Sequence, residues 1–131
     1  MDPNDVASAR AAGRVVRDVM RSRPKTLPAD ATVADVRRLF ADTHVVTALL
    51  VDGARFAGAV DRASIQAAPD DAPARTLARD DESVIISPDA TVAEAMSRLD
   101  RDDSLRLVVV EPDATLDGLL CLNAARTSFC A

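Results

Sequence analysis

Few residues in this sequence have both the type and the spacing that chemistry requires. His44 is the only histidine, and no cysteine, histidine or carboxylate cluster surrounds it in the sequence. We interpret it as a loop histidine with a structural or incidental role. The acidic runs at residues 70–71, 80–82 and 100–103 are typical of solvated loops. There is no nucleophile elbow, phosphate-binding loop, dinucleotide fingerprint or metalloprotease motif. The sequence therefore predicts neither a catalytic site nor a metal site.

Two further groups of residues could carry chemistry. The two cysteines, Cys121 and Cys130, are too few for a disulfide scaffold, and their spacing fits no zinc pattern. We expect Cys121 to be buried in a strand and Cys130 to be a thiol in a mobile tail. Four arginines recur at helical spacing on one face of a helix predicted over residues 5–21: Arg10, Arg14, Arg17 and Arg21. This stripe would suit an acidic partner or an anion, but we prefer an ordinary amphipathic helix with a solvated face.

The composition narrows the class of protein. A chain of 131 residues is long enough for one compact domain with a real core. A net charge of −5 argues against general nucleic-acid binding, and three phenylalanines without tryptophan or tyrosine offer little for base stacking. No apolar run is long enough to cross a membrane, and the first residues lack the pattern of a signal peptide. We expect a cytoplasmic protein with neither nucleic acid nor membrane as a partner.

The clearest feature is a repeat. The segment DATVAD at residues 30–35 returns as DATVAE at residues 89–94, 59 residues later. Thr32 and Thr91 each precede an apolar run of helical period. With Asp35 and Glu94 three residues further on, each forms the pattern of a capping box. We predict that a helix begins at each of these points and buries one apolar face.

The elements around the two helices also match. A short β-prone segment precedes each helix, at residues 26–27 and 84–86. Apolar runs at 48–51 and 107–110 predict buried strands, and second strands follow at 55–60 and 115–122, with Gly58 and Gly118 inside them. Helical segments at 62–67 and 123–127 close the copies, the second with Asn123 as a cap. Each half therefore reads β-α-β-β-α, and the fold class is α/β of the α+β kind. We place an N-terminal helix and lead-in at 1–23, units at 24–68 and 76–131, and a linker at 69–75.

This ordered, duplicated pattern resembles a tandem pair of CBS domains (cystathionine β-synthase domains), also called a Bateman module. The first copy carries VRDVM, TLPADATV, ADVRRLF, ALLVDG and FAGAVDRASI, and the second carries VIISPDATVAEAM, LRLVVVE and LDGLLCLNAA. The resemblance covers residues 15–127. It implies two units related by pseudo-twofold symmetry with their sheets packed together, a regulatory role without catalysis, and homodimers. It also implies a cleft between the units for an adenine nucleotide (AMP, ADP or ATP) or S-adenosylmethionine, with no cofactor required.

The resemblance also implies where a ligand would bind. In nucleotide-binding members a glycine is followed by two apolar residues, a hydroxyl residue for phosphate, two more residues and an aspartate for the ribose. Here Asp61 and Ser64 stand at the phosphate and ribose positions of the first copy, and Cys121 and Ala124 at those of the second. The ribose aspartate is therefore absent from both copies. The implied ligand-binding positions are Lys25, Thr26, Ala48, Asp61 and Ser64 in the first copy and Val84, Ile85, Arg106, Leu107 and Cys121 in the second.

Arg106 is the most informative of these positions, because the family often places a basic phosphate contact there. It could equally be a solvated arginine at a strand edge. We predict a non-catalytic sensor that binds a small molecule, most simply an adenine-type nucleotide, and passes the signal to a regulated protein partner. The alternative is a CBS pair that has lost its ligand and serves as a dimerisation or docking scaffold, which the missing aspartates favour.

Overall fold

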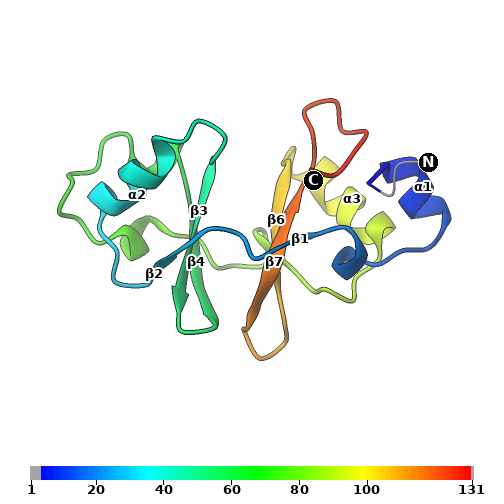
Figure 1. The fold of residues 1–131 in the computed structure, drawn as a ribbon, viewed down its shortest axis with the longest axis horizontal. Helices are drawn as coiled ribbons and strands as arrows, with labels where there is room; N and C mark the ends of the chain where they lie inside the picture. The colour runs from blue at the N-terminus through cyan, green and yellow to red at the C-terminus, as the bar shows by residue number, and fades with distance from the viewer. Residues whose placement is uncertain (1–3, 131) are drawn as a thin grey trace. The chain divides into compact units, whose positions relative to one another are not determined.

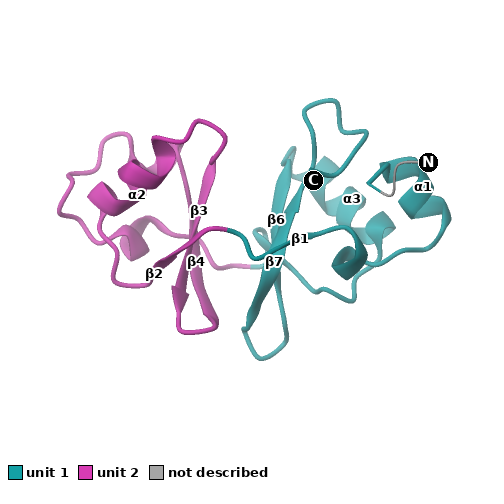
Figure 2. Ribbon diagram, viewed as in Figure 1, with its two compact units in different colours: residues 1–24, 82–131 teal, residues 25–81 magenta. Residues whose placement is uncertain are grey.

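The computed structural model describes residues 4–130, and the chain divides into two compact units (Figure 2). Unit 2 is one continuous stretch, Lys25–Asp81, whereas unit 1 combines the chain up to Pro24 with everything from Glu82 onward. Each unit has one sheet with its main helix packed against it (Figure 1). The fold is therefore the mixed α+β type that the repeat predicts.

Unit 2 is built on a three-stranded sheet in the order β2-β3-β4. Strand β2 (Thr26–Pro28) is parallel to β3 (Thr47–Asp52), which pairs antiparallel with β4 (Arg55–Asp61). Helix α2 (Val33–Phe40) lies between β2 and β3 in the chain, and two 3-10 helices follow β4, η2 (Ala63–Ile65) and η3 (Ala74–Leu77). The core is a cluster of small and medium apolar side chains from the helix, the sheet and both 3-10 helices: Ala31, Val33, Val36, Phe40, Ala48, Leu50, Val60, Ile65 and Ala74.

Unit 1 has a four-stranded sheet in the order β1-β7-β6-β5. Strand β5 (Ile85–Ile86) is parallel to β6 (Arg106–Val110), and β7 (Leu116–Cys121) is antiparallel both to β6 and to β1 (Arg21–Ser22). The main helix is α3 (Val92–Arg101), and the N-terminal segment adds α1 (Val6–Ala11) and the 3-10 helix η1 (Val16–Asp18). Its core contains the larger apolar side chains of these elements: Val16, Val19, Ile86, Val92, Met96, Leu99, Leu107, Val109, Leu120, Leu122 and Phe129, with Val6, Ala9 and Ala95.

Both predicted helix starts are confirmed. The Thr32 hydroxyl accepts a hydrogen bond from the Asp35 amide (3.3 Å), and the Asp35 carboxylate accepts one from the Thr32 amide (2.9 Å), which completes a capping box. In the second copy, the Thr91 hydroxyl accepts from the Glu94 amide (3.1 Å). These bonds satisfy amides that have no partner within the first helical turn.

The segment that precedes each copy in the sequence packs with the other copy. The amide of Val33, the first residue of α2, donates to the carbonyl of Ala72 (2.9 Å), which lies after the first copy. The amide of Val92, the first residue of α3, donates to the carbonyl of Arg14 (2.9 Å), which lies before the first copy. In each unit, the first amide of the main helix therefore bonds to the segment that precedes the other copy in the sequence.

These exchanged segments explain the glycine in each last strand. A Cβ on Gly58 would lie 2.5 Å from the Cβ of Ala78, and a Cβ on Gly118 would lie 2.5 Å from the carbonyl oxygen of Arg21. Gly58 also has a φ of +146°, which side-chain-bearing residues rarely adopt. The two glycines allow a neighbouring segment to lie directly against the strand.

Three helix predictions were wrong. The helix expected over residues 5–21 ends at Ala11, because the chain then turns at Gly13 (φ +68°) and continues as a 3-10 turn and a strand. The segment 62–67 forms only η2, and 123–127 forms a turn. In that turn the Asn123 side chain accepts hydrogen bonds from the amides of Thr127 (2.8 Å) and Ser128 (3.2 Å). Asn123 therefore caps a turn and starts no helix.

The expectation of a free thiol in a mobile tail was also wrong. Cys121 and Cys130 form a disulfide with a Cα–Cα distance of 5.2 Å. The burial of Cys121 is confirmed, since its exposed fraction is 5 %. Sequence spacing could not reveal this pairing, because the chain must turn back after β7 to bring the two cysteines together.

Candidate functional site

Three residues that could take part in ligand binding, Arg21, Arg106 and Cys121, lie on one face of the unit 1 sheet, the face opposite its core cluster. Arg106 begins β6 and is the register partner of Cys121 on β7. Arg21 on β1 is the partner of Leu119, two residues before Cys121. Paired residues of neighbouring strands project to the same face, and so do residues two apart along a strand. The side chains of Arg21, Arg106 and Cys121 therefore share this face.

Arg106 is held at its backbone and is half-buried at its side chain. Its amide donates to the Ser104 hydroxyl (3.2 Å), which in turn donates to the Arg106 carbonyl (3.0 Å). Burial lowers the pKa of the Arg106 guanidinium, and the charge of Arg21 lowers it further. Within residues 4–130, no ion pair joins either guanidinium to a carboxylate. The arginine pair, Arg21 and Arg106, is thus a positive site without a neutralising acid.

The equivalent positions of unit 2 have different chemistry. There Thr47 begins β3 and pairs with Asp61 at the end of β4, where unit 1 has Arg106 and Cys121. Arg79 pairs with Ala59 as Arg21 pairs with Leu119. The Arg79 guanidinium, however, lies 3.7 Å from a carboxylate oxygen of Asp81. The unit 2 position therefore holds an acid and a neutralised arginine, and it would repel a phosphate.

The remaining predicted residues are spread over several environments. Lys25 is exposed and its ammonium pairs with Asp42 (3.2 Å), while Thr26 is exposed at the start of β2. Ala48 and Leu107 belong to the two core clusters, so only their main-chain groups remain for a ligand. Val84 and Ile85 are half-buried at the edge strand β5, where the Val84 carbonyl accepts from the amide of Val108 (2.8 Å).

The two ribose positions also differ from each other. Ser64 is half-buried within η2, whereas Ala124 is exposed in the turn after β7. Neither side chain has a carboxylate that could accept from two adjacent hydroxyls. Any nucleoside bound beside these strands would therefore be held without the ribose aspartate.

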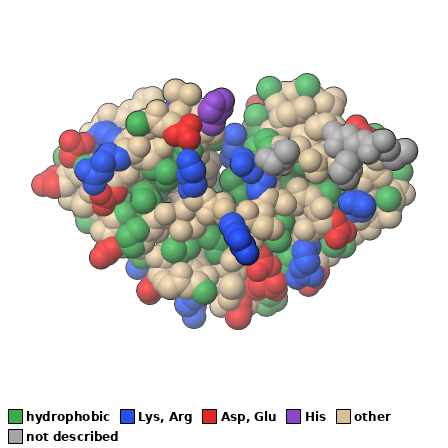
Figure 3. Space-filling model, viewed as in Figure 1, with side chains coloured by type: hydrophobic (Ala, Val, Ile, Leu, Met, Phe, Trp, Pro, Cys, Tyr) green, Lys and Arg blue, Asp and Glu red, His purple; other side chains and the backbone are tan. Residues whose placement is uncertain are grey.

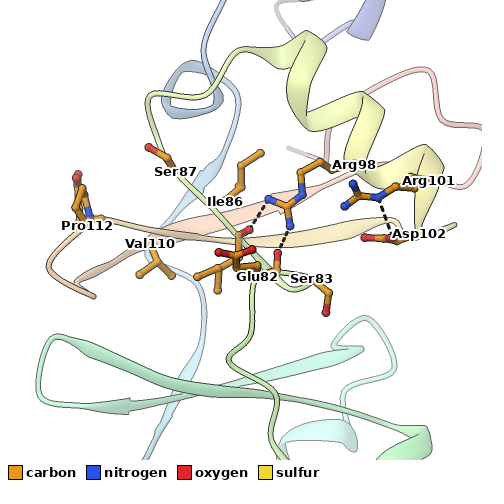
Figure 4. A pocket seen from close by; sticks show the side chains of 11 residues that line it. Glu82, Ser83, Ile86, Ser87, Arg98, Arg101, Asp102, Val110 and Pro112 are labelled. Carbon is orange, nitrogen blue, oxygen red and sulfur yellow. Dashed lines mark hydrogen bonds and ion pairs between the residues drawn. The ribbon is translucent and has the colours of Figure 1, made fainter.

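A pocket of about 760 Å³ lies along β5 in unit 1 (Figure 4). Of the predicted site residues only Ile85 lines it, and Arg98 donates to the Ile85 carbonyl (2.7 Å) and to the carbonyl of Glu82. Its second arginine, Arg101, pairs with Asp102 (3.3 Å). Since both cations are already engaged and three carboxylates line the pocket, it is poorly suited to a phosphate.

The other residues considered in the sequence stand apart from these sites. His44 is exposed and its amide donates to Asp42 (3.0 Å). The four arginines expected on one helix are distributed over α1, the following turn, η1 and β1, so the stripe on a helix face was wrong. Acidic and basic side chains are mixed over the visible face of both units (Figure 3). In the described part of the chain, no three metal-ligating side chains gather.

Arg21 is the site residue that the sequence interpretation missed. The predicted helix over residues 5–21 would place it on a solvated helix face. In the structure Arg21 lies on β1 and pairs with Leu119 of β7, which is 98 residues further along the chain. A weak signal was available. Val19-Met20-Arg21 and Leu77-Ala78-Arg79 share two apolar residues followed by arginine, 58 residues apart. Extending the repeat backwards from residue 25 would have matched these two segments.

Comparisons with known proteins agree with this architecture. Residues 16–71 match the family model of the CBS domain. A search of curated protein sequences finds no match. Modules of this family are generally regulatory and non-catalytic. Between residues 4 and 130, no helix combines the length and apolarity needed to cross a bilayer.

Solved structures with the same fold include nucleotide complexes. The cystathionine beta-synthase pair domain of a candidate Mg²⁺ transporter from Shewanella oneidensis MR-1 matches with a TM-score of 0.74 and 22% identity, over 85% of this chain and 67% of that one. A CBS domain protein from Pyrobaculum aerophilum complexed with AMP has a TM-score of 0.70 and 23% identity, over 82% and 86%. The cytosolic domain of the Mg²⁺ channel MgtE in complex with ATP has a TM-score of 0.71 and 17% identity, over 87% and 49%. At these identities the likeness shows the fold.

Proposed function

We propose that this chain, which matches the CBS domain over residues 16–71 and has the fold of a tandem CBS pair, is a non-catalytic regulatory module that binds a phosphate-bearing adenine nucleotide. Two of the similar structures hold AMP and ATP. The phosphate would bind at the arginine pair of unit 1. A change in the packing or dimer geometry on binding would then be read by a partner protein, provided that the ligand binds the two states with different affinity.

The observation that carries this proposal is the charge of the arginine pair. Two guanidinium groups that interact without an acidic partner destabilise each other, and burial of Arg106 adds to that cost. A phosphate would relieve the repulsion and accept charge-assisted hydrogen bonds. The cationic sulfonium of S-adenosylmethionine would not, so we rank the nucleotides AMP, ADP and ATP above it.

Binding is tested by thermal unfolding of the oxidised chain with AMP, ADP, ATP, NADH and S-adenosylmethionine, followed by calorimetry. A ligand at a hundred times its Kd stabilises the native state by about 2.7 kcal/mol, which a melt detects. Arg106→Gln should weaken nucleotide binding about 10- to 100-fold, since a hydrogen bond to a charged group contributes about 1.5–3 kcal/mol. Arg21→Gln should weaken it less, because Arg21 is exposed.

Arg79→Gln is the matched control for Arg21→Gln, because Arg79 is the equivalent of Arg21 in unit 2, and it should leave nucleotide affinity unchanged. Equal losses for Arg79→Gln and Arg106→Gln would show that the arginine pair is not the phosphate site. No stabilisation by any nucleotide at millimolar concentration would overturn the nucleotide proposal itself.

The alternative function is a ligand-free dimerisation or docking scaffold. The observation in its favour is the absence of a ribose carboxylate at Ser64 and Ala124. A scaffold would show no thermal shift and would remain a homodimer across salt concentrations. Light scattering at low and high salt, alongside the melts, separates the two functions.

A further inference from the structure

The C-terminal segment of unit 1 folds back on the end of β7. After the turn at Asn123, Leu122 and Phe129 pair as a β-bridge. The Cys130 amide donates to the Cys121 carbonyl (2.8 Å), and the Asn123 amide donates to the Ser128 carbonyl (2.9 Å). The Cys121–Cys130 disulfide joins the same two residues as the first of these backbone hydrogen bonds and closes the hairpin at its open end.

The same segment also holds the N-terminal region of unit 1. The Val6 amide at the start of α1 donates to the Thr127 carbonyl (2.9 Å), and the Phe129 amide donates to the Asn4 carbonyl (2.8 Å). Phe129 is buried in the unit 1 core, with 3 % of its surface exposed. Opening the segment would therefore remove a side chain from the core together with two backbone hydrogen bonds to the N-terminal region, one of them to α1.

We propose that the Cys121–Cys130 pair is a redox-sensitive latch that fastens residues 123–130 and α1 to the sheet. The two cysteines are the only ones in the chain, so they have no other intramolecular partner. Their Cα atoms lie 5.2 Å apart, within the range that a disulfide spans without backbone movement. In a reducing compartment such as the cytoplasm, a disulfide of this kind is expected to open and close with the redox state.

The chemistry is thiol–disulfide exchange with a dithiol. Cys130 is half-buried and Cys121 is buried, so the attacking thiolate reaches the Cys130 sulfur. A bond forms between the reagent and Cys130, the bond to Cys121 breaks, and the Cys121 sulfur leaves with the electron pair and takes a proton. The second thiol of the reagent then displaces the Cys130 thiolate. The protein gains two electrons and two protons, and the dithiol becomes a cyclic disulfide.

The latch is also connected to the arginine pair through the β6–β7 ladder, and this part of the inference rests on the proposed function. Cys121 is the register partner of Arg106 in the β6–β7 ladder, so opening the latch frees the strand end that positions Arg106. If a nucleotide binds the oxidised chain more tightly by some factor, linkage requires it to make the disulfide harder to reduce by the same factor.

The test compares amide hydrogen exchange of the full chain after treatment with oxidised or reduced dithiothreitol. Reduction should speed exchange at residues 122–130 and at α1 by about tenfold to a hundredfold, since the disulfide restrains a loop of about ten residues in the opened state. Exchange in unit 2 should not change, which provides an internal control. Cys130→Ser should behave like the reduced chain and should not respond to dithiothreitol.

Equal exchange at residues 122–130 in the two redox states would overturn the latch. The same holds for a response to dithiothreitol in Cys130→Ser, because that variant has no disulfide to reduce. AMP affinity, measured in both states, tests the coupling separately. A redox effect on exchange without nucleotide binding in either state would support the latch and overturn the proposed function.

Discussion

The two units share the same arrangement of strands around a main helix but differ in charge at corresponding positions. At the start of the middle strand and the end of the next, unit 2 has Thr47 and Asp61 where unit 1 has Arg106 and Cys121. The arginine beside the hairpin pairs with Asp81 in unit 2, whereas in unit 1 it pairs with no carboxylate of residues 4–130. The core positions, in contrast, are apolar in both units. The core positions are therefore alike in the two units, whereas the positions on the opposite face of each sheet have diverged, so the two units should not bind the same ligand.

The two glycines should show the largest effects on stability. Gly58→Ala should cost about 3 kcal/mol, because it combines backbone strain with overpacking against Ala78. Gly118→Ala should cost about 2 kcal/mol and should detach β1, since its Cβ would lie 2.5 Å from the Arg21 carbonyl oxygen. Urea unfolding measures both losses.

A second substitution distinguishes the two glycines. Ala78→Gly should recover part of the loss in Gly58→Ala, because the contact there is a side chain, while no side-chain change relieves the backbone contact at Gly118. Gly53→Ala is the control. It meets nothing within 4 Å and should cost only about 1 kcal/mol for its positive φ. A cost at Gly53 equal to that at Gly58 would mean that close approach is not the cause.

The disulfide is a further difference between the two units, because unit 2 contains no cysteine. Reducing it, or replacing both cysteines by serine, should lower the free energy of unfolding by about 2.5 kcal/mol. The reason is that the unfolded chain then regains the conformational entropy of a loop of about ten residues, which the disulfide had restricted. The Tm measured with and without dithiothreitol checks this. Identical melting of the oxidised chain and of the double serine variant would contradict it.

The helix caps should differ by a smaller amount. Thr91→Ala removes the one side-chain bond that caps α3 and should cost about 1 kcal/mol. Thr32→Ala leaves the bond from the Thr32 amide to Asp35 in place and should cost somewhat less. Chemical denaturation of the two variants gives the difference, and replacement by serine instead of alanine should preserve most of each cap. A larger loss at Thr32 would reverse this ranking of the two units.

The dependence of stability on pH should have opposite signs at one acid of each unit. The backbone hydrogen bond from Thr32 lowers the pKa of Asp35 in unit 2, so its stabilisation is present above its ordinary pKa and is lost as the pH falls. In unit 1 the hydrogen bond with Asp117 raises the pKa of Glu111, so its contribution is present at low pH and is lost as the pH rises through the raised value.

Urea midpoints between pH 3 and 7 test these signs. Asp35→Asn should reduce the loss of stability on acidification, and Glu111→Gln should gain stability relative to the wild type as the pH rises. A parallel shift of both variants with pH would contradict the assignment of the two groups.

The sequence by itself determined the repeat, both helix starts and the chain order of strands β2 to β7, but not β1. These features depend on local signals, namely capping residues and the period of apolar side chains, which lie within a few residues of each other. The resemblance to the CBS family also indicated Arg106 and the two missing ribose aspartates, and their part in ligand binding stays a prediction.

The tertiary structure alone decided the exchange of the lead-in segments, the partnership of Arg21 with Arg106 and the Cys121–Cys130 disulfide. Each of these joins groups through pairing to β7 or a return of the chain, and local periodicity carries no information about such contacts. The predicted helices at 5–21, 62–67 and 123–127 failed for the same reason. Those stretches bond across the chain to strands and helix ends, and these tertiary bonds outweighed their own weak helical preference.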